Sequence, residues 1–391
     1  MIAPPAELAR CLQPPQDFDA RLAVEVLLRD ALQRRASDLH LRPTPHHVEV
    51  LLRIDGALFH HHDLPLEIYE RLLIGLKNLA RVASFRKSVP QDGRLSIDGC
   101  EARLSTGPTH FGEKAILRLS RTQEPLPQLE QLGFSPEALQ RWLQALAEPQ
   151  GLVLATGPAG SGKSTTLYAS LLWRLASRRA EGCQLNVVTL EDPIERVLPG
   201  LTQTQVQAAA GMTFATGLRS LLRQDPDVVL VGEIRDGETA AAAVQSSLSG
   251  HLVLSTVHAR DSLGVIPRLL EMGVEPYLLS ASLSGVIYQR LLRRLCPACG
   301  SQGCPACLHT GYSGRLAVAE VLLLSDPLRQ GVLDRWPLAQ LRQVAESEGM
   351  LSLAEDARRR VAQGHTCALE VQRCLGASAN PVKSCKQAPN A

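Results

Sequence analysis

Hydrophobic residues recur at helical spacing from residue 18 to 35, which predicts an amphipathic helix. The apolar positions of this helix are Leu22, Val26, Leu27, Ala31 and Leu32. A second amphipathic helix is predicted from Ile68 to Val82, with strand-like runs at 38–41 and 48–54 between the two. Alternating polar and apolar positions from 94 to 119 predict a small sheet. Residues 18–122 are therefore expected to form a compact α+β domain.

Four short apolar runs, separated by helical segments, mark the part of the chain that follows. They read GLVLATG (151–157), NVVTL (186–190), DVVLVGE (227–233) and HLVLST (251–256). Short buried strands alternating with helices predict a mostly parallel sheet covered by helices. We assign this sheet to a domain at 135–325, joined to the first by a proline-containing linker at 123–134 and followed by a helical subdomain at 326–376.

The ends of the chain carry little core-forming material. Residues 1–17 are rich in Pro, Ala and Gln and are expected to be a loose leader, and residues 377–391 are expected to be disordered. The leader has no basic region followed by an apolar core, so we do not interpret it as a secretory signal. No apolar stretch approaches the roughly 18 residues that a membrane span needs.

Composition narrows the class of protein. With 391 residues, 45% hydrophobic and 20% charged, the chain is expected to fold as two or three domains. A net charge of +2 and an aromatic content of 4% argue against a nucleic-acid-binding surface, which is normally basic and offers aromatic rings for stacking. The ten cysteines are interpreted as cytosolic thiols, since disulfides rarely persist in the cytosol.

A glycine-rich loop follows the first of the four apolar runs and fits G-x-x-x-x-G-K-[ST]. The expected nucleotide-binding residues are Gly157, Pro158, Ala159, Gly160, Ser161, Gly162, Lys163, Ser164 and Thr165. Glycines let backbone N–H groups converge on a polyphosphate, and the N-terminus of the following helix favours the same anion. Lys163 is expected to reach the β- and γ-phosphates of ATP, and the Ser164 hydroxyl to ligate Mg²⁺.

Three further side chains follow predicted strands, where ligands of parallel sheets bind. Glu233 ends the run at 227–233 and is expected to polarise a water for attack on the γ-phosphate, although a surface glutamate is the plainer interpretation. Glu191 opens the acidic segment EDPIE and is expected to orient Mg²⁺-bound or attacking water, although Asp-Pro pairs are also ordinary turn formers. His258 follows HLVLST and either senses the γ-phosphate or is structural.

The order of these motifs resembles the secretion ATPase superfamily, in the branch that powers type II secretion and type IV pilus assembly in bacteria. The motor motifs are the loop at 157–164, EDPIE (191–195), DPDVVLVGEIRD (225–236), with Gly232 in the usual aspartate position, and GHLVLSTVHA (250–259). Similar segments in the first domain are ASDLHL (36–41), RIDG (53–56), PQDGR (90–94), EARLST (101–106) and GEK (112–114). The resemblance covers residues 20–375.

This resemblance implies an α/β fold in which a RecA-like P-loop motor domain follows a smaller, PAS-like α+β domain. It also implies a homo-hexameric ATPase that binds its nucleotide between the two domains. The expected location is the cytoplasm, peripheral at the inner membrane through partners. The expected partners are an inner-membrane platform protein and, peripherally, the membrane itself. Arginines that complete the site are implied at Arg94, Arg103, Arg219, Arg223 and Arg235, with surface salt bridging as the plainer alternative. Longer members dock through an additional N-terminal domain, so recruitment here is expected through residues 18–122.

Two C-x-x-C pairs, separated by four residues, form a cysteine-rich insertion at 296–307. Cys296, Cys299, Cys304 and Cys307 are expected to hold a structural Zn²⁺, because four thiolates leave no open coordination position. The family pattern has a much longer spacer, and an iron–sulfur or redox role or a metal-free vestige are the alternatives. The remaining six cysteines show no ligand spacing.

Type II secretion is the expected role, with pilus assembly or DNA uptake as the alternatives within the superfamily. A retraction motor is disfavoured by the cysteine pairs and by PQDGR, and a nucleic-acid translocase by the charge balance. A nucleotide-sensing subunit that hydrolyses almost no ATP is the alternative of another class. A GTPase is disfavoured because we find no N/T-K-x-D motif.

Overall fold

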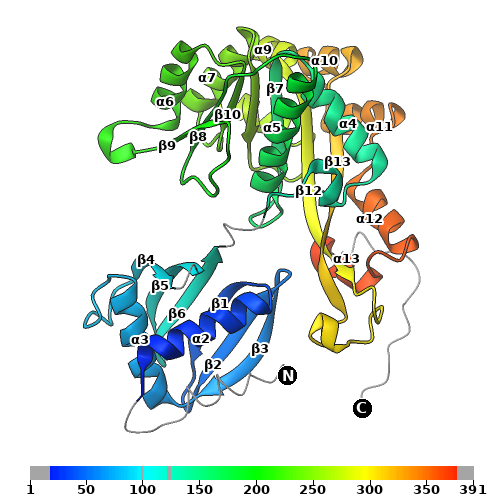
Figure 1. The fold of residues 1–391 in the computed structure, drawn as a ribbon. Coiled ribbons are helices and arrows are strands. Elements are labelled where there is room, and N and C mark those ends of the chain that lie inside the picture. The colour runs from blue at the N-terminus through cyan, green and yellow to red at the C-terminus, as the bar shows by residue number, and fades with distance from the viewer. Residues whose placement is uncertain (1–17, 98–99, 121–124, 377–391) are drawn as a thin grey trace. The chain divides into compact units, whose positions relative to one another are not determined.

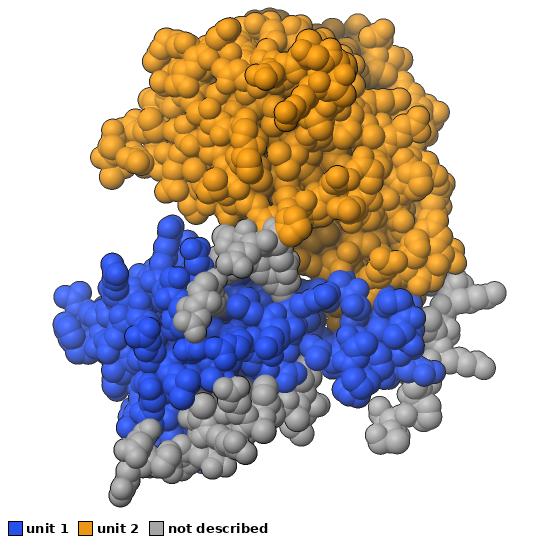
Figure 2. Space-filling view, viewed as in Figure 1, with its two compact units in different colours: residues 1–124, 295–314 blue, residues 125–294, 315–391 orange. Residues whose placement is uncertain are grey.

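The computed structural model describes residues 18–97, 100–120 and 125–376. Its contacts divide the chain into two compact units, Met1–Glu124 with Leu295–Gly314, and Pro125–Arg294 with Arg315–Ala391 (Figure 2). The expected leader at 1–17 and tail at 377–391 lie outside the described residues. No helix among the described residues combines the length and the apolar character that a membrane crossing requires.

The first unit is built on a six-stranded sheet in the order β3-β2-β1-β6-β5-β4, with antiparallel neighbours throughout. The strands are β1 Ala36–Pro43, β2 Val48–Ile54, β3 Ala57–Leu64, β4 Gln91–Ile97, β5 Cys100–Thr109 and β6 Gly112–Ser120. Helices α2 (Ala20–Gln33) and α3 (Leu66–Leu79) cover one face of this sheet (Figure 1). Their apolar faces and the inward-facing strand residues form one hydrophobic core.

Local sequence explains the first helix. The Asp19 carboxylate accepts hydrogen bonds from the N–H groups of Arg21 and Leu22, so the helix begins at Ala20, within the predicted span. Strand β3 is absent from the prediction because its sequence, ALFHHHDL, replaces an apolar alternation with three histidines. An irregularity in the pairing between Val50 and Leu51 further disturbs the alternation of this strand.

The second unit is built on a seven-stranded sheet in the order β13-β12-β7-β11-β10-β8-β9. The strands are β7 Gly151–Thr156, β8 Val187–Glu191, β9 Thr202–Gln205, β10 Val228–Val231, β11 Leu252–Thr256, β12 Leu283–Leu295 and β13 Tyr312–Leu323. The pairs from β12 through β7, β11, β10 and β8 to β9 are parallel, as the four apolar runs predict.

Helices cover both faces of this sheet, so its central strands are buried on both sides. Leu152 and Leu154 of β7 belong to one core, and Val153 and Ala155 belong to the other. Burial on both faces explains why these strands are continuous apolar runs. The helices are α4 Pro136–Ala147, α5 Lys163–Ala180, α6 Phe214–Leu221, α7 Gly237–Leu248, α8 Val265–Glu271, α9 Pro276–Ser282, α10 Asp326–Leu333, α11 Leu338–Ser347, α12 Leu353–Ala362 and α13 Ala368–Leu375.

Strands β12 and β13 are the main difference from the sequence-based expectation. No strand was expected between the cysteine segment and the helical subdomain at 326–376, but residues Tyr312–Leu323 form a strand with seven consecutive buried positions, Leu316 to Leu322. Periodicity alone does not distinguish such a continuous apolar run from a buried helical segment. The cysteine segment, expected within the motor domain, belongs by its contacts to the first unit. There the Gly314 N–H donates to the Asp55 carboxylate at 2.8 Å, and Leu308 packs against the core.

A buried ion pair joins helix α3 to the sheet of the first unit. The Lys77 Nζ is 2.7 Å from the Glu113 Oε1, and both side chains are at most 2% exposed. Lys77 also donates to the Arg86 carbonyl at 2.8 Å, and the Tyr69 hydroxyl donates to the Glu113 carbonyl. The pair therefore ties α3 to β6 and to the segment that precedes β4.

We expect Glu113→Gln to lower the free energy of unfolding of the first unit by about 3–5 kcal/mol, because Lys77 would remain buried without a counter-charge. Glu70→Gln is the matched control, since the Glu70–Lys87 pair is exposed and worth under about 1 kcal/mol. Urea denaturation of both variants measures the difference. Equal losses of stability in the two variants would contradict the expectation.

Candidate functional site

The glycine-rich loop joins β7 to α5 and adopts backbone angles that its glycines permit. Gly157, Gly160 and Gly162 have φ values of 142°, 73° and 89°. A Cβ on Gly157 would lie 2.6 Å from the Gln289 carbonyl oxygen, closer than any real Cβ contact. Gly162 immediately precedes α5, so the loop ends on the N-terminus of a helix 18 residues long. This arrangement provides convergent N–H groups and a favourable helix dipole for an anion.

Lys163 is held inside the loop that it follows. Its Nζ donates to the carbonyl oxygens of Gly157 and Pro158, at 2.9 and 3.0 Å. Burial lowers the pKa of Lys163, while the carboxylates of Glu233 and Glu195 act in the opposite direction. The amine is therefore positioned by two carbonyl groups that a bound phosphate can replace. Ser164 and Thr165 lie half-buried beside it in the first turn of α5.

Glu233 lies two residues beyond β10, at the carboxyl end of the strand. Its side chain is 16% exposed and forms an ion pair with Arg235, whose side chain is 65% exposed. The hydrogen bond and the charge of Glu233 raise the pKa of the Arg235 guanidinium. The negative charge of Glu233 favours the protonated form of Lys163, so the two side chains lie within electrostatic reach of each other.

Glu191 is the last residue of β8 and is buried. Its Oε2 accepts from the Tyr168 hydroxyl, and its Oε1 accepts from Thr189 Oγ1 at 2.6 Å and from Gln203 Nε2 at 3.1 Å. Burial and the hydrogen bond to this carboxylate raise the pKa of Tyr168. A carboxylate has about four acceptor positions, so these three donors leave little capacity for a water.

The other predicted residues of the motor domain lie at its surface. His258 is exposed and has no hydrogen-bond partner among the described residues. Arg219 forms an exposed ion pair with Glu238 at 2.9 Å, and Arg223 donates to the Arg219 carbonyl at 3.0 Å. These arginines therefore have protein partners in this structure.

Arg94 and Arg103 lie directly opposite each other on β4 and β5, and both are exposed. Arg103 in turn lies opposite Arg118 of β6, which pairs with Asp38 at 3.3 Å. Like charges directly opposite on a sheet are destabilising. Arg94 and Arg103 have no acidic partner within the described parts of the chain. These two side chains therefore present uncompensated positive charge to solvent.

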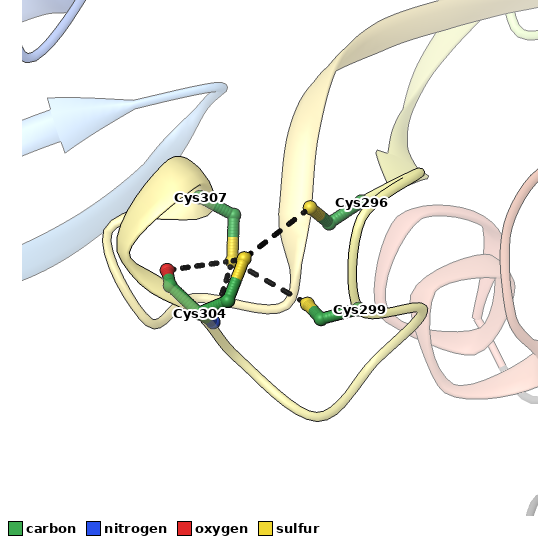
Figure 3. A group of neighbouring side chains, drawn as sticks. All are labelled: Cys296, Cys299, Cys304 and Cys307. Atoms are coloured by element: carbon green, nitrogen blue, oxygen red, sulfur yellow. Dashed lines mark hydrogen bonds between the residues drawn. The ribbon is translucent and has the colours of Figure 1, made fainter.

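The four cysteines converge in the first unit (Figure 3). Their sulfur atoms all lie within 4.8 Å of one another, with Cys296–Cys304 at 3.9 Å, Cys299–Cys307 at 3.7 Å and Cys304–Cys307 at 3.8 Å. A tetrahedron with Zn–S bonds of about 2.3 Å has sulfur atoms about 3.8 Å apart. The short spacer therefore does not prevent all four thiols from facing one ion.

Backbone groups favour the thiolate form of one cysteine in this cluster, Cys307. Burial alone would raise the pKa of Cys307, but N–H groups of Cys304 and Gly311, which lie 3.2 and 3.3 Å from its sulfur, contribute to lowering it to about 6. Burial and the neighbouring sulfurs raise the pKa of Cys299 to about 12. A metal ion would favour the thiolate of every ligand.

Three residues at the nucleotide loop and the acidic segment were not predicted: Gln289, Tyr168 and Gln203. Gln289 of β12 contacts Ser161 and Thr166, although more than 100 positions separate it from them in the sequence. Tyr168 and Gln203 engage Glu191 from α5 and β9. No motif marks these residues, since only the strand order and the helix packing bring them to the site.

Comparison with known proteins identifies the family. The family described as "Type II/IV secretion system protein" matches residues 17–373. The chain belongs to that family. The resemblance to secretion ATPases that the motifs indicate is thereby confirmed.

Individual family relatives differ in length from this chain. The type II secretion system protein HxcR of Pseudomonas aeruginosa is 42% identical over 362 residues, which cover 90% of this chain and 76% of that protein. The type IV pilus assembly ATPase PilB of Thermus thermophilus is 40% identical, over 90% of this chain and 42% of its own length. The chain thus spans less than half of the second relative.

A solved structure supports the fold class. The ATPase DotB of Legionella pneumophila matches with a TM-score of 0.70 and 21% identity, over 95% of this chain and 98% of its own. The predicted α/β class, a P-loop domain with a smaller α+β domain, is confirmed.

We expect Gly157→Ala to abolish ADP binding, because the new Cβ would collide with the backbone of β12. Gly160→Ala is the control. That glycine also has a positive φ, but no atom lies within 4 Å of its Cβ position, so the change adds strain without a collision. Titration with a fluorescent ADP analogue compares the two. Similar affinities for both variants would show that the contact with β12 does not shape the loop.

Proposed function

We propose that this chain is an ATP-hydrolysing motor subunit that drives pseudopilus assembly and protein export in a type II secretion system. The observation that carries the proposal is the placement of Lys163, in a glycine-rich loop, within electrostatic reach of Glu233 at the end of β10. The similarity to HxcR favours type II secretion. Type IV pilus assembly, or DNA uptake by a related machine, is the second candidate, favoured by the similarity to PilB.

The chemistry follows from these residues. The loop N–H groups and Lys163 bind the phosphates of ATP, and the Ser164 hydroxyl contributes a ligand to Mg²⁺, which neutralises phosphate charge when bound. Glu233 accepts a proton from the attacking water. Glu191 orients water through the acceptor position that its three donors leave.

The exposed arginines supply positive charge to the γ-phosphate in this proposal. Arg94 and Arg103 are suited to it because an anion would relieve the repulsion between them. Arg219, Arg223 and Arg235 contribute after exchanging their present partners, and His258 senses the phosphate. Guanidinium groups stabilise charge on the transferred phosphoryl group.

The assembly proposed is a homo-hexamer that acts with an inner-membrane platform protein. It works on the cytoplasmic side of that membrane, through partners and peripheral contact. Nucleic acid is not a proposed partner, given a net charge of +2. Zinc at the four cysteines is proposed as a structural ion, because the sulfur spacing fits a tetrahedral site.

We expect Glu233→Gln to lower kcat for ATP hydrolysis at least about 100-fold, because the amide cannot accept the proton of the attacking water. Glu271→Gln, which alters an exposed ion pair at 3.6 Å, should leave kcat unchanged. Phosphate release is measured on the purified protein, with and without acidic phospholipid, after its mass in solution has been determined.

Wild-type protein that binds ATP but shows no turnover in any oligomeric state would contradict the autonomous motor. The nucleotide-sensing subunit would then be the better interpretation. Turnover that survives in Glu233→Gln would instead remove Glu233 from its proposed role.

We expect the purified protein to contain one zinc ion per chain, and Cys304→Ser to lose it and to unfold at a lower temperature. Cys183→Ser is the control, because Cys183 is an exposed cysteine outside the cluster. Elemental analysis measures the metal. Iron in place of zinc, or equal metal content in both variants, would contradict the zinc assignment.

A further inference from the structure

Gln289 lies in β12, the strand next to β7, and only 1% of its surface is exposed. The preceding residue, Tyr288, is in register with Thr156, the last residue of β7 before the glycine-rich loop. A buried amide beside an apolar strand requires hydrogen-bond partners on both of its ends. Gln289 finds them in the loop and in the helix that follows.

The Gln289 side chain bridges these two segments. Its Nε2 donates to the Ser161 carbonyl oxygen at 2.6 Å, and its Oε1 accepts from Thr166 Oγ1 at 3.0 Å. The carbonyl of Ser161 can only accept, so the amide must present its NH₂ group there. The orientation of Gln289 is therefore set by its partners.

The hydrogen bond to Ser161 controls the direction of a loop N–H group. In a trans peptide the carbonyl oxygen and the following N–H point in opposite directions. Holding the Ser161 carbonyl toward Gln289 therefore turns the Gly162 N–H away from β12. The same contact keeps a carbonyl dipole from facing an anion in the loop.

The partner of Gln289 on the helix is itself anchored. The Thr166 carbonyl accepts from Ser170 Oγ at 2.7 Å, and Ser170 Oγ accepts from Trp142 Nε1 at 2.9 Å. Trp142 of α4 is fully buried. A continuous chain of hydrogen bonds thus runs from Trp142 through Thr166 and Gln289 to the loop.

We propose that Gln289 is a positioning residue for phosphate binding: its amide holds the Ser161–Gly162 peptide in the orientation that receives the phosphates of the nucleotide. This role rests on the proposed function, since it concerns the same nucleotide site. Gln289 acts through the loop backbone and the first turn of α5.

The first test is the Kd for ADP of Gln289→Leu, which removes both hydrogen bonds at similar volume. We expect about tenfold weaker binding, as the loss of a buried hydrogen-bond partner implies. Thr166→Val removes only the bond to Oε1 and should weaken binding about threefold. Gln340→Leu, an exposed glutamine on α11, is the matched control and should bind as wild type does.

A pH signature separates positioning from a general effect on stability. In Gln289→Glu the carboxylate can still accept from Thr166 but cannot donate to the Ser161 carbonyl. Burial raises the pKa of such a carboxyl group, and its protonated form can donate. We therefore divide the Kd for ADP of this variant by the wild-type Kd at the same pH. This ratio should decrease as the pH is lowered from 8 to 6.

The outcomes distinguish this role from the proposed function. Wild-type protein that binds neither ADP nor ATP would overturn the proposed function. Wild-type binding with Gln289→Leu within twofold of it would overturn the positioning role alone. If Gln289→Leu does not fold, then wild-type affinity in Thr166→Val, together with a pH-independent ratio in Gln289→Glu, would overturn it.

Discussion

A loop whose N–H groups converge on an anion must direct its carbonyl groups elsewhere. Side chains of the second unit hold these carbonyl groups by hydrogen bonds. Lys163 engages the carbonyls of Gly157 and Pro158, and Gln289 engages that of Ser161. The parallel sheet makes these contacts possible because it places β12 directly beside β7. Gly157 is required for the same reason, since only a residue without Cβ allows the two backbones to approach so closely.

The charged groups around the loop differ in how firmly they are held. Glu191 is buried and engaged by three donors, whereas Glu233 is partly exposed and paired with an exposed arginine, Arg235. An exposed ion pair contributes little to stability, so it can be exchanged for a ligand at low cost. A buried carboxylate that accepts three hydrogen bonds is held more firmly. The two acids that the sequence presents as similar candidates are therefore physically distinct.

The sequence predicts most of what depends on local pattern. The nucleotide loop, the strands at 151–156 and 228–231 and the capped helix at Ala20–Gln33 follow from spacing and composition. Strands β3 and β13 do not, because histidines interrupt one and burial on both faces removes the period of the other. Gln289 and Tyr168 also escape prediction, since their roles arise from strand order and helix packing, which no local pattern encodes.

The cysteine segment makes the first unit discontinuous in sequence, because Leu308 and Gly314 contact residues that precede Glu124. The ribosome makes proteins from the N-terminus, so the chain to Glu124 is finished before Leu295–Gly314 exists. The intervening residues, Pro125–Arg294, take on the order of 10–30 s to synthesise at about 5–20 residues per second. The segment Leu295–Gly314 is synthesised after the sheet strands β7 to β11. Until then the Asp55 carboxylate and the surface that contacts Leu308 remain exposed to solvent. The first unit can therefore be completed only after most of the second unit has been synthesised.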